Sequence, residues 1–308
     1  MSRLDERASG VFVIAVTPFT DDGSLDLTST DSMVDFYLEK GATGLTVLGM
    51  MGEAPKLTTD ESAQFVKRVM ARVGPQFPVV VGVSAPGFAS MKELSSRVMD
   101  LGASGVMVAP PSTLRTDDQL FHYFTGAAET LGDTPWVLQD FPLATTVQMS
   151  ASAILRIVEA VPSCVMLKHE DWPGLAKIDA LRAAEKKGAR RISILTGNGG
   201  MFLPEEMHRG ADGAMTGFAY PEMMSQIVAA HHASEFERAQ DLFDAYLPLA
   251  RYEQQPGLGL AVRKYTLAKR GAIATPMLRR PGPTLSAGDI ADIDRLTARL
   301  ARRLKELD

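Results

Sequence analysis

The sequence lacks most features of a secreted, membrane-spanning or nucleic-acid-binding protein. It holds a single cysteine, Cys164, in 308 residues, which excludes an intrachain disulfide framework. No apolar run approaches the length of a membrane-spanning helix, and the N-terminus, Met1-Ser-Arg-Leu-Asp-Glu-Arg7, lacks the apolar segment of a signal peptide. A formal net charge of −5 and a pI near 5.6 offer no basic surface for nucleic acid or an anionic membrane. We therefore expect a cytoplasmic protein that acts on a small molecule.

What the chain does have is the composition of a protein with a sizeable core. Hydrophobic residues make up 45% and charged residues 22%, which allows one large domain or two ordinary ones. Short β-rich runs alternate with amphipathic stretches every roughly 25 to 35 residues, the rhythm of repeated βα units. The expected strands are Val11–Thr17, Gly44–Leu48, Pro78–Val83, Gly105–Ala109, Pro135–Asp140, Ser163–Lys168, Arg191–Thr196 and Gly213–Thr216.

The stretches between these strands predict helices that start at Ser or Thr and end near glycine. They include Leu27–Lys40, Thr59–Val73, Ala89–Leu101, Thr116–Leu131 and Ser150–Val161. One short phrase also precedes several strands, as in Gly41-Ala-Thr-Gly44, Gly102-Ala-Ser-Gly105 and Gly210-Ala-Asp-Gly213. This recurrence indicates one αβ turn that is reused around a closed array.

We therefore predict an α/β fold, a TIM (β/α)8 barrel over residues 1–232 with a C-terminal extension of three helices over residues 233–308. The alternative is a doubly wound open sheet. Such a sheet usually carries a glycine-rich phosphate-binding turn after its first strand, where this chain has Thr17-Pro-Phe-Thr-Asp-Asp-Gly23.

Lys168 ends the sixth predicted strand, and the C-terminal ends of barrel strands carry the chemistry. A lysine in a desolvated place can attack a carbonyl and form a Schiff base. Glu170 faces the same side if the extended backbone continues. The local pattern alone also fits a surface lysine beside a solvated glutamate, but the barrel position favours catalysis. We take Lys168 as the nucleophile and Glu170 as the proton shuttle; the alternative role for Glu170 is an ion pair that positions Lys168.

Several motifs, in this order and spacing, resemble the dihydrodipicolinate synthase/N-acetylneuraminate lyase family of Schiff-base lyases over nearly the whole chain. They are Val16-Thr-Pro-Phe19 with Asp22-Gly23, Gly49-Met-Met-Gly-Glu53 with Leu57 and Glu61, Val80-Val-Gly-Val83, Gly105-Val-Met-Val-Ala-Pro-Pro111 and Lys168. The resemblance implies a barrel, a metal-free and cofactor-free reaction on a 2-oxo acid, and a homo-oligomer, either a dimer or a tetramer.

The chain departs from the family members that make dihydrodipicolinate. Those members have Thr-Thr where this chain has Met50-Met51, and a strand-five tyrosine where it has Gln139. Ala144 replaces the arginine that holds their second substrate, and Ser112 replaces a tyrosine lent to the neighbouring subunit. These differences argue against synthesis in the lysine pathway.

The same positions resemble another type in the family, the L-2-keto-3-deoxyarabonate dehydratases. The shared runs are Gln139-Asp-Phe-Pro-Leu143, Lys168-His-Glu170, Gly210-Ala-Asp-Gly-Ala-Met-Thr-Gly217 and Tyr220-Pro221. The Met50-Met51 pair departs from that type too. We therefore predict dehydration, or aldol cleavage, of a 2-keto-3-deoxy sugar acid. The alternatives are dihydrodipicolinate synthesis and a barrel that binds a ligand without catalysis.

Six further residues are candidates for substrate binding. The backbone N–H groups of Met50, Met51 and Gly52 form an anion nest for a carboxylate, although the methionines also suit ordinary packing. Gln139 can bind a substrate hydroxyl or tie strand five to its neighbour. Asn198 and Thr216 stand at the ends of strands seven and eight.

The remaining polar residues carry no expected function. His169 alternates away from Lys168 and predicts a buried structural histidine, whereas the other histidines, in helical stretches, show no metal-ligand spacing. Glu205-Glu206 and Asp21-Asp22 are expected to be solvated. The basic run from Lys264 to Arg280 predicts the polar face of a helix followed by a proline-rich loop.

Overall fold

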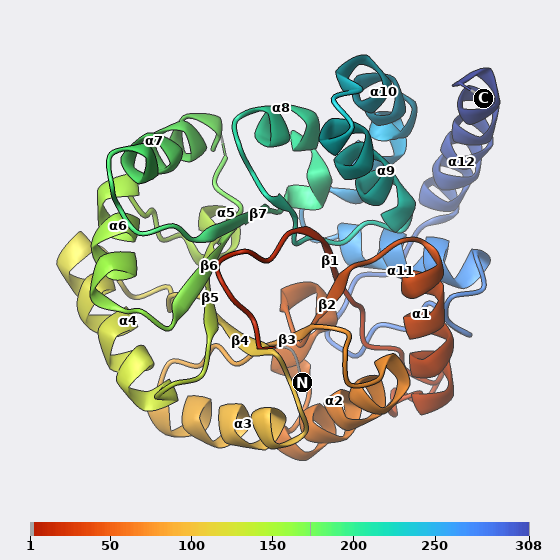
Figure 1. Cartoon of the computed structure of the whole chain (residues 1–308). Coiled ribbons are helices and arrows are strands. Elements are labelled where there is room, and N and C mark those ends of the chain that lie inside the picture. The colour runs from red at the N-terminus through yellow and green to blue at the C-terminus, as the bar shows by residue number, and fades with distance from the viewer. Residues whose placement is uncertain (1–2, 173, 308) are drawn as a thin grey trace.

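Eight parallel strands close into a barrel in chain order, from β1 beside β2 round to β8 beside β1, in a computed structural model that describes residues 3–172 and 174–307. Figure 1 shows this barrel at the centre of a ring of helices. The closed barrel confirms the predicted fold and excludes the doubly wound sheet. The strands are β1 Gly10–Ile14, β2 Gly44–Val47, β3 Val79–Gly82, β4 Gly105–Val108, β5 Trp136–Asp140, β6 Cys164–His169, β7 Ser193–Thr196 and β8 Gly213–Ala214.

The helices fall where the sequence predicts them, and side-chain caps explain the starts of α1, α2, α4 and α6, whereas α3 starts after Gly87 without one. Thr58 and Thr116 each close a capping box, with Glu61 and Gln119 respectively. None of the described helices is long and apolar enough to cross a bilayer. The ring consists of α1 Leu27–Glu39, α2 Thr59–Val73, α3 Phe88–Asp100, α4 Asp117–Leu131, α6 Ala151–Ala160, α7 Leu175–Lys186, α8 Leu203–His208 and α9 Pro221–His232, while the short α5 Pro142–Thr145 lies inside it (Figure 1).

The repeated αβ turn is real. Gly41, Gly102 and Gly210, the first residues of the three similar phrases, have φ values of 85°, 100° and 94°. Only glycine adopts these angles without strain, so the phrase fixes the same reversal each time. The turns bring each strand back beside its predecessor and so close the barrel.

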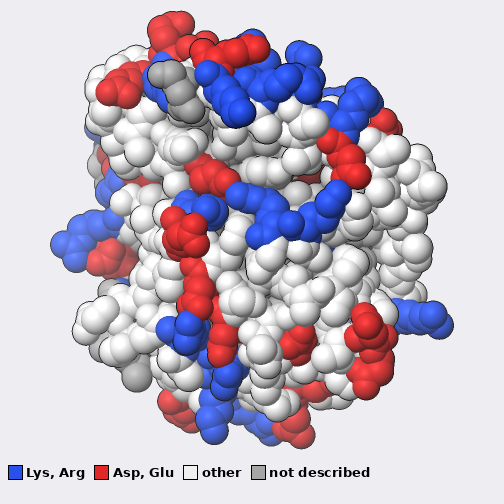
Figure 2. All heavy atoms as spheres, turned by 90° about the vertical axis from the view of Figure 1, so that its right-hand side faces the viewer, with Lys and Arg blue, Asp and Glu red and all other residues white. Residues whose placement is uncertain are grey.

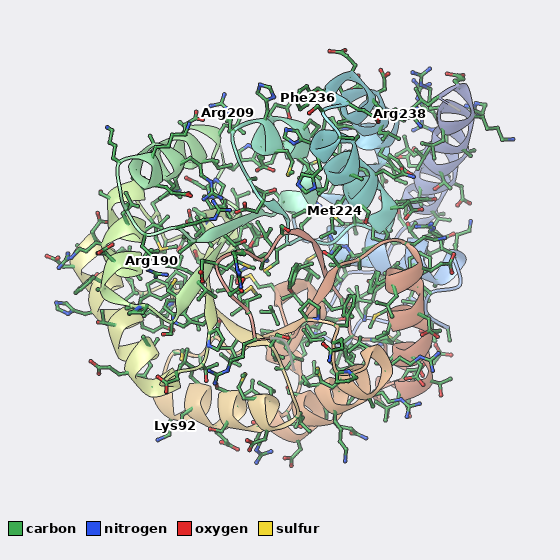
Figure 3. The ribbon with its side chains drawn as sticks, viewed as in Figure 1. Lys92, Arg190, Arg209, Met224, Phe236 and Arg238 are labelled. Carbon is green, nitrogen blue, oxygen red and sulfur yellow. The ribbon has the colours of Figure 1, made fainter. Side chains whose placement is uncertain are left out.

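The core has two layers. One apolar cluster fills the inside of the barrel. Its members include Leu4, Phe12, Val80, Met107 and Met166. A larger cluster lies between the outer faces of the strands and the helices. Figure 3 shows Lys92 pointing away from α3, whereas Met224 of α9 lies within the packed interior. Side chains fill the barrel, and the C-terminal ends of its strands form the mouth, where the sites of such barrels lie.

The C-terminal extension is three helices, as predicted: α10 Phe236–Glu253, α11 Gly259–Lys269 and α12 Ala287–Leu307. Ile293, Leu296 and Leu300 are the buried residues of α12. On the face shown in Figure 2, acidic and basic side chains are interspersed. Pairs such as Lys269–Asp294 are half exposed and contribute little, so apolar packing holds the extension. The division into two domains at residue 232, where α9 ends, stays a prediction.

The prediction for Glu206 was wrong. This side chain is only 6% exposed, because α8 packs it against the outer surface of the barrel near Thr196 and His169. One carboxyl oxygen, Oε2, has no hydrogen-bond partner among the described residues. Burial raises the pKa of Glu206 to about 7, although Thr196 and His169 oppose the rise.

We expect Glu206→Gln to stabilise the protein above pH 7 but not in acid. The folded carboxyl holds its proton between its ordinary pKa of 4.5 and about 7, whereas the unfolded one has lost it, so wild-type stability falls as pH rises through this window. The neutral amide removes that fall, and the gain is on the order of 1–3 kcal/mol at pH 8. Urea unfolding at pH 4 and pH 8 measures it, with exposed Glu237→Gln as control. A difference that is the same at both pH values would contradict this account.

Candidate active site

A buried lysine and a buried glutamate meet at the mouth of the barrel. Lys168 Nζ lies 2.8 Å from Glu170 Oε1, and the two side chains are 5% and 6% exposed. Gln139 Nε2 donates to the same oxygen over 2.7 Å. The other oxygen, Glu170 Oε2, accepts no hydrogen bond from a described residue. Glu170 therefore has one oxygen engaged and one available for a proton.

Strand geometry explains this meeting. Gln139 on β5 is the register partner of Lys168 on β6. Alternation turns Lys168 and Glu170 into the barrel and His169 out of it, as the sequence predicts. His169 is 1% exposed, with Nε2 3.0 Å from Gly174 O. Asp140 also faces outward, with Oδ2 2.7 Å from Lys177 Nζ, which leaves Glu170 as the carboxylate that contacts the buried amine.

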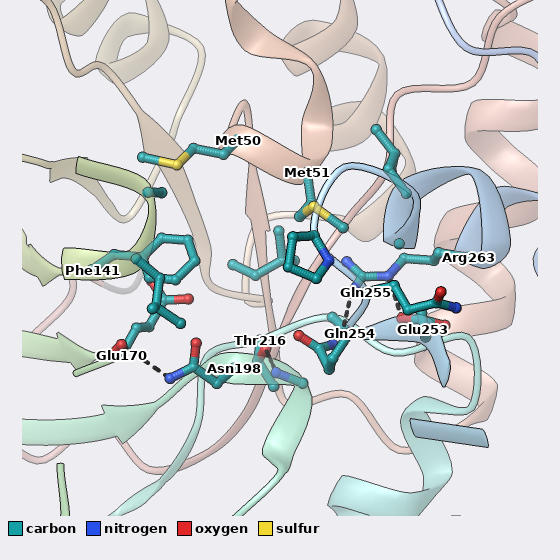
Figure 4. A pocket seen from close by; sticks show the side chains of 18 of the residues that line it. Met50, Met51, Phe141, Glu170, Asn198, Thr216, Glu253, Gln254, Gln255 and Arg263 are labelled. Atoms are coloured by element: carbon teal, nitrogen blue, oxygen red, sulfur yellow. Dashed lines mark hydrogen bonds and ion pairs between the residues drawn. The ribbon is translucent and has the colours of Figure 1, made fainter. Parts of the chain in front are cut away.

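These groups open onto a cavity of about 440 Å³. Figure 4 shows the cavity with Glu170 and Asn198 on one side and the side chains of Met50 and Met51 across from them. All the predicted site residues except Gly52 line it: Met50, Met51, Gln139, Lys168, Glu170, Asn198 and Thr216. Gly52 is not among the lining residues, and its N–H is already used, since it donates to Gly49 O over 3.0 Å.

Asn198 and Thr216 make hydrogen bonds that hold the backbone around the cavity in place. Asn198 Nδ2 donates to the backbone oxygen of Glu170 over 3.0 Å. Thr216 Oγ1 accepts from the Gly199 N–H over 2.8 Å. Both residues hold the loop after β7 against its neighbours and line the cavity at the same time.

The turn after β2 presents free backbone donors. Met50 and Met51 start a short 3-10 helix, Met50–Gly52, and neither N–H donates to a described residue. Successive free N–H groups at a helix start attract an anion. They are therefore suited to a carboxylate in the cavity that Lys168 also lines.

Buried ion pairs of Glu53 hold the turn after β2 in place. Glu53 follows the turn at a φ of 56° and is 2% exposed. Its Oε1 lies 2.6 Å from Lys264 Nζ and its Oε2 lies 2.8 Å from Lys56 Nζ. The Arg279 N–H also donates to Oε2, over 3.1 Å. The extension thus fixes the turn.

The prediction of a solvated polar face was therefore wrong for Lys264. This side chain is fully buried, and burial lowers its pKa to about 8 against the opposing effect of Glu53. The proline-rich loop after α11 exists as predicted, but Lys264 Nζ donates to Met277 O within it over 2.8 Å.

Sequence reasoning missed one side of the cavity. Glu253 and Arg263, from α10 and α11, line it and form a buried pair with Oε1 and Nε 2.7 Å apart. Burial raises the pKa of Glu253, and Arg263 opposes the rise. Gln254 and Gln255 come from the connection between the two helices. The only local signal was the run Gln254-Gln-Pro-Gly257 between two helical patterns.

A barrel with a buried amine at its mouth is typical of lyases that work through a Schiff base. Residues 7–296 match the Dihydrodipicolinate synthetase family. The chain is 30% identical over 306 residues to L-2-keto-3-deoxyarabonate dehydratase of Azospirillum brasilense, covering 98% of this chain and 96% of that one. The chain belongs to the dihydrodipicolinate synthetase family, and it is a class I lyase.

Two further relatives carry the name of the synthase. The 4-hydroxy-tetrahydrodipicolinate synthase of Thiobacillus denitrificans is 29% identical over 284 residues, covering 91% of this chain and 93% of that one. The crystal structure of dihydrodipicolinate synthase from Rhodopseudomonas palustris has a TM-score of 0.95 and 51% identity, covering 97% of this chain and all of that one. The comparisons thus agree on the family, but the relatives are named for different reactions, one a dehydration and the others a synthesis.

We expect Lys264→Met to destabilise the protein by about 3 kcal/mol, because it leaves the buried Glu53 carboxylate short of one cation. The turn that it supports should also loosen, so KM for a 2-oxo acid rises more than kcat falls. Denaturant unfolding and steady-state kinetics measure both effects. The double variant Glu53→Gln/Lys264→Met should recover much of the stability. A Lys264→Met protein as stable as the exposed-site control Lys269→Met would contradict the role of this contact.

Proposed function

We propose that the protein dehydrates a 2-keto-3-deoxy sugar acid through a Schiff base on Lys168. The observation that carries this proposal is the buried triad of Lys168, Glu170 and Gln139, with contacts of 2.8 Å and 2.7 Å at Glu170 Oε1. A carboxylate beside the amine supplies an acid and base without a tyrosine. The similarity to the Azospirillum dehydratase supports the same reading.

The proposed reaction begins when Lys168 Nζ attacks C2 of the substrate and water leaves, giving an imine. The imine withdraws electrons, so Glu170 Oε2 takes a proton from C3 and an enamine forms. The C4–O bond then breaks, and Glu170 returns its proton to the departing hydroxide, which leaves as water. Hydrolysis of the remaining imine releases the product and restores Lys168.

The N–H groups of Met50 and Met51 are proposed to hold the substrate carboxylate, because neither donates to a described residue and both methionines line the cavity. Gln139 holds the carboxylate of Glu170 through Oε1, over 2.7 Å, and leaves Oε2 for the proton. A homo-oligomer and a cytoplasmic location remain proposals from the family resemblance and the composition.

Aldol cleavage shares every step up to the imine and differs in which bond breaks. Dihydrodipicolinate synthesis is a second candidate, because the Rhodopseudomonas relative bears that name at 51% identity. Ala144 and Gln139 argue against it, since neither supplies the cationic or phenolic group expected at these two places. A protein that only binds a ligand has no need of a buried amine, which costs folding energy.

Borohydride should trap a 2-oxo acid on Lys168. Incubation with pyruvate or a 2-keto-3-deoxy acid, followed by reduction, should add the reduced adduct's mass to the peptide that contains Lys168. Lys168→Ala should gain no mass, because Lys168 is the one lysine among the described residues that line the cavity. Peptide mapping by mass spectrometry gives the answer, and label on another lysine would refute the mechanism.

Glu170→Gln should keep imine trapping but lose roughly a hundredfold or more in turnover, because the amide cannot accept the C3 proton. Trapping rate and steady-state turnover are measured across pH on the same preparation. An ion-pair role for Glu170 predicts a different result, in which trapping weakens together with turnover. Near-normal turnover would remove Glu170 from the mechanism.

Aspartate semialdehyde should be a poor co-substrate for pyruvate. Its carboxylate would meet Ala144 and the apolar side chains of Phe141 and Leu143 in place of a cation. A coupled assay of cyclic product formation tests this expectation. Efficient turnover there would favour the synthase over the dehydratase.

A further inference from the structure

Arg263 of the C-terminal extension forms the side of the cavity opposite Glu170. Figure 4 shows Glu170 and Asn198 at one side, Thr216 between, and Arg263 at the other. The arginine is only 2% exposed. Gly217 makes room for it, since a Cβ there would lie 2.2 Å from Arg263 Nη1. The guanidinium is thus built into the wall of the cavity.

This guanidinium carries more donors than its protein partners use. Nε donates to Glu253 Oε1 over 2.7 Å, and Nη2 donates to Gly217 O over 2.6 Å. Nη1 has no hydrogen-bond partner among the residues that the structure describes. Arginine stays charged, and a buried donor without a partner is costly, so such a group normally finds water or a ligand.

The charges around the cavity are balanced in pairs. Lys168 and Arg263 are the cationic side chains among the described lining residues, and each contacts a buried carboxylate, Glu170 at 2.8 Å and Glu253 at 2.7 Å. The free N–H groups of the turn after β2 suit one substrate carboxylate. A second carboxylate at the far side would lie near Glu253 without a cation of its own.

We propose that Arg263 determines specificity by donating from Nη1 to a hydroxyl at the distal end of a monocarboxylic 2-oxo acid. The inference rests on the proposed function, because Lys168 fixes the other end of the substrate. Gln254 and Gln255, in the same wall, suit an uncharged, hydroxylated chain. The site therefore favours a distal hydroxymethyl group over a methyl group and over a second carboxylate.

Three 4-hydroxy-2-oxo acids that differ only at the far end test the proposal on the wild-type enzyme. One carries a hydroxymethyl group, one a methyl group and one a carboxylate. We expect kcat/KM for the hydroxymethyl compound to exceed both others by roughly ten- to a hundredfold. A dicarboxylate that is used equally well would overturn the proposal without any variant.

Arg263→Lys keeps a positive charge opposite Glu253 but loses the forked donors. Its KM for the hydroxymethyl compound should rise roughly tenfold, while values for the methyl compound change little. Arg270→Lys is the matched control, since Arg270 follows the same helix but pairs with Glu222 outside the cavity, Nη2 to Oε1 2.5 Å. An equal loss on both compounds would show a structural role and overturn the proposal.

A second variant guards against misfolding. Glu253→Gln/Arg263→Met removes both buried charges and should abolish the preference for the hydroxymethyl compound; a preserved preference overturns the inference.

Trapping of pyruvate at Lys168, measured in every variant, separates the proposed function from the role of Arg263, because pyruvate has no distal end. If the Arg263 variants still trap pyruvate at Lys168 and keep the preference for the hydroxymethyl compound, only the role of Arg263 is refuted. No trapping in the wild-type enzyme with any 2-oxo acid sinks the proposed function itself and the inference with it.

Discussion

The site depends on keeping one charged pair, Lys168 and Glu170, out of water at the mouth of a closed barrel. Removing two charges from water is expensive, and their attraction offsets the cost only with good geometry and further hydrogen bonds. The 2.8 Å contact and the bond from Gln139 meet both conditions. Because Gln139 and Lys168 are register partners on β5 and β6, a shift of one strand by one residue would separate the group.

The two ends of the proposed substrate are served by different parts of the chain. The turn after β2 offers backbone N–H groups for the carboxylate, and buried contacts between Glu53 and Lys264 fix that turn. In the proposal the far end lies beside Glu253 and Arg263, which belong to the extension and line the cavity. The extension therefore braces the turn proposed to bind the carboxylate and lines the cavity at its far side, while the barrel strands hold Lys168 and Glu170.

The features that could be predicted from the sequence are those that depend on local backbone geometry. A repeated glycine phrase needs only its own positive φ, and the spacing of Lys168 and Glu170 needs only strand alternation. Burial of charge is not local. Arg263 bonds to Gly217, 46 residues away, and Lys264 to Glu53, 211 residues away. In sequence they look like the solvated residues of any amphipathic helix, so their burial, like that of Glu206, emerged only from the packed structure.

Exchange of the C3 protons of pyruvate in deuterated water tests the central claim most directly, because it reports the imine and the proton shuttle together. Proton NMR should show the wild-type enzyme replacing these protons with deuterium. Lys168→Ala should show no exchange above buffer, and Glu170→Gln should exchange roughly a hundredfold or more slowly than the wild type although it still forms the imine. Exchange by Lys168→Ala at the wild-type rate, or undiminished exchange by Glu170→Gln, would contradict the account.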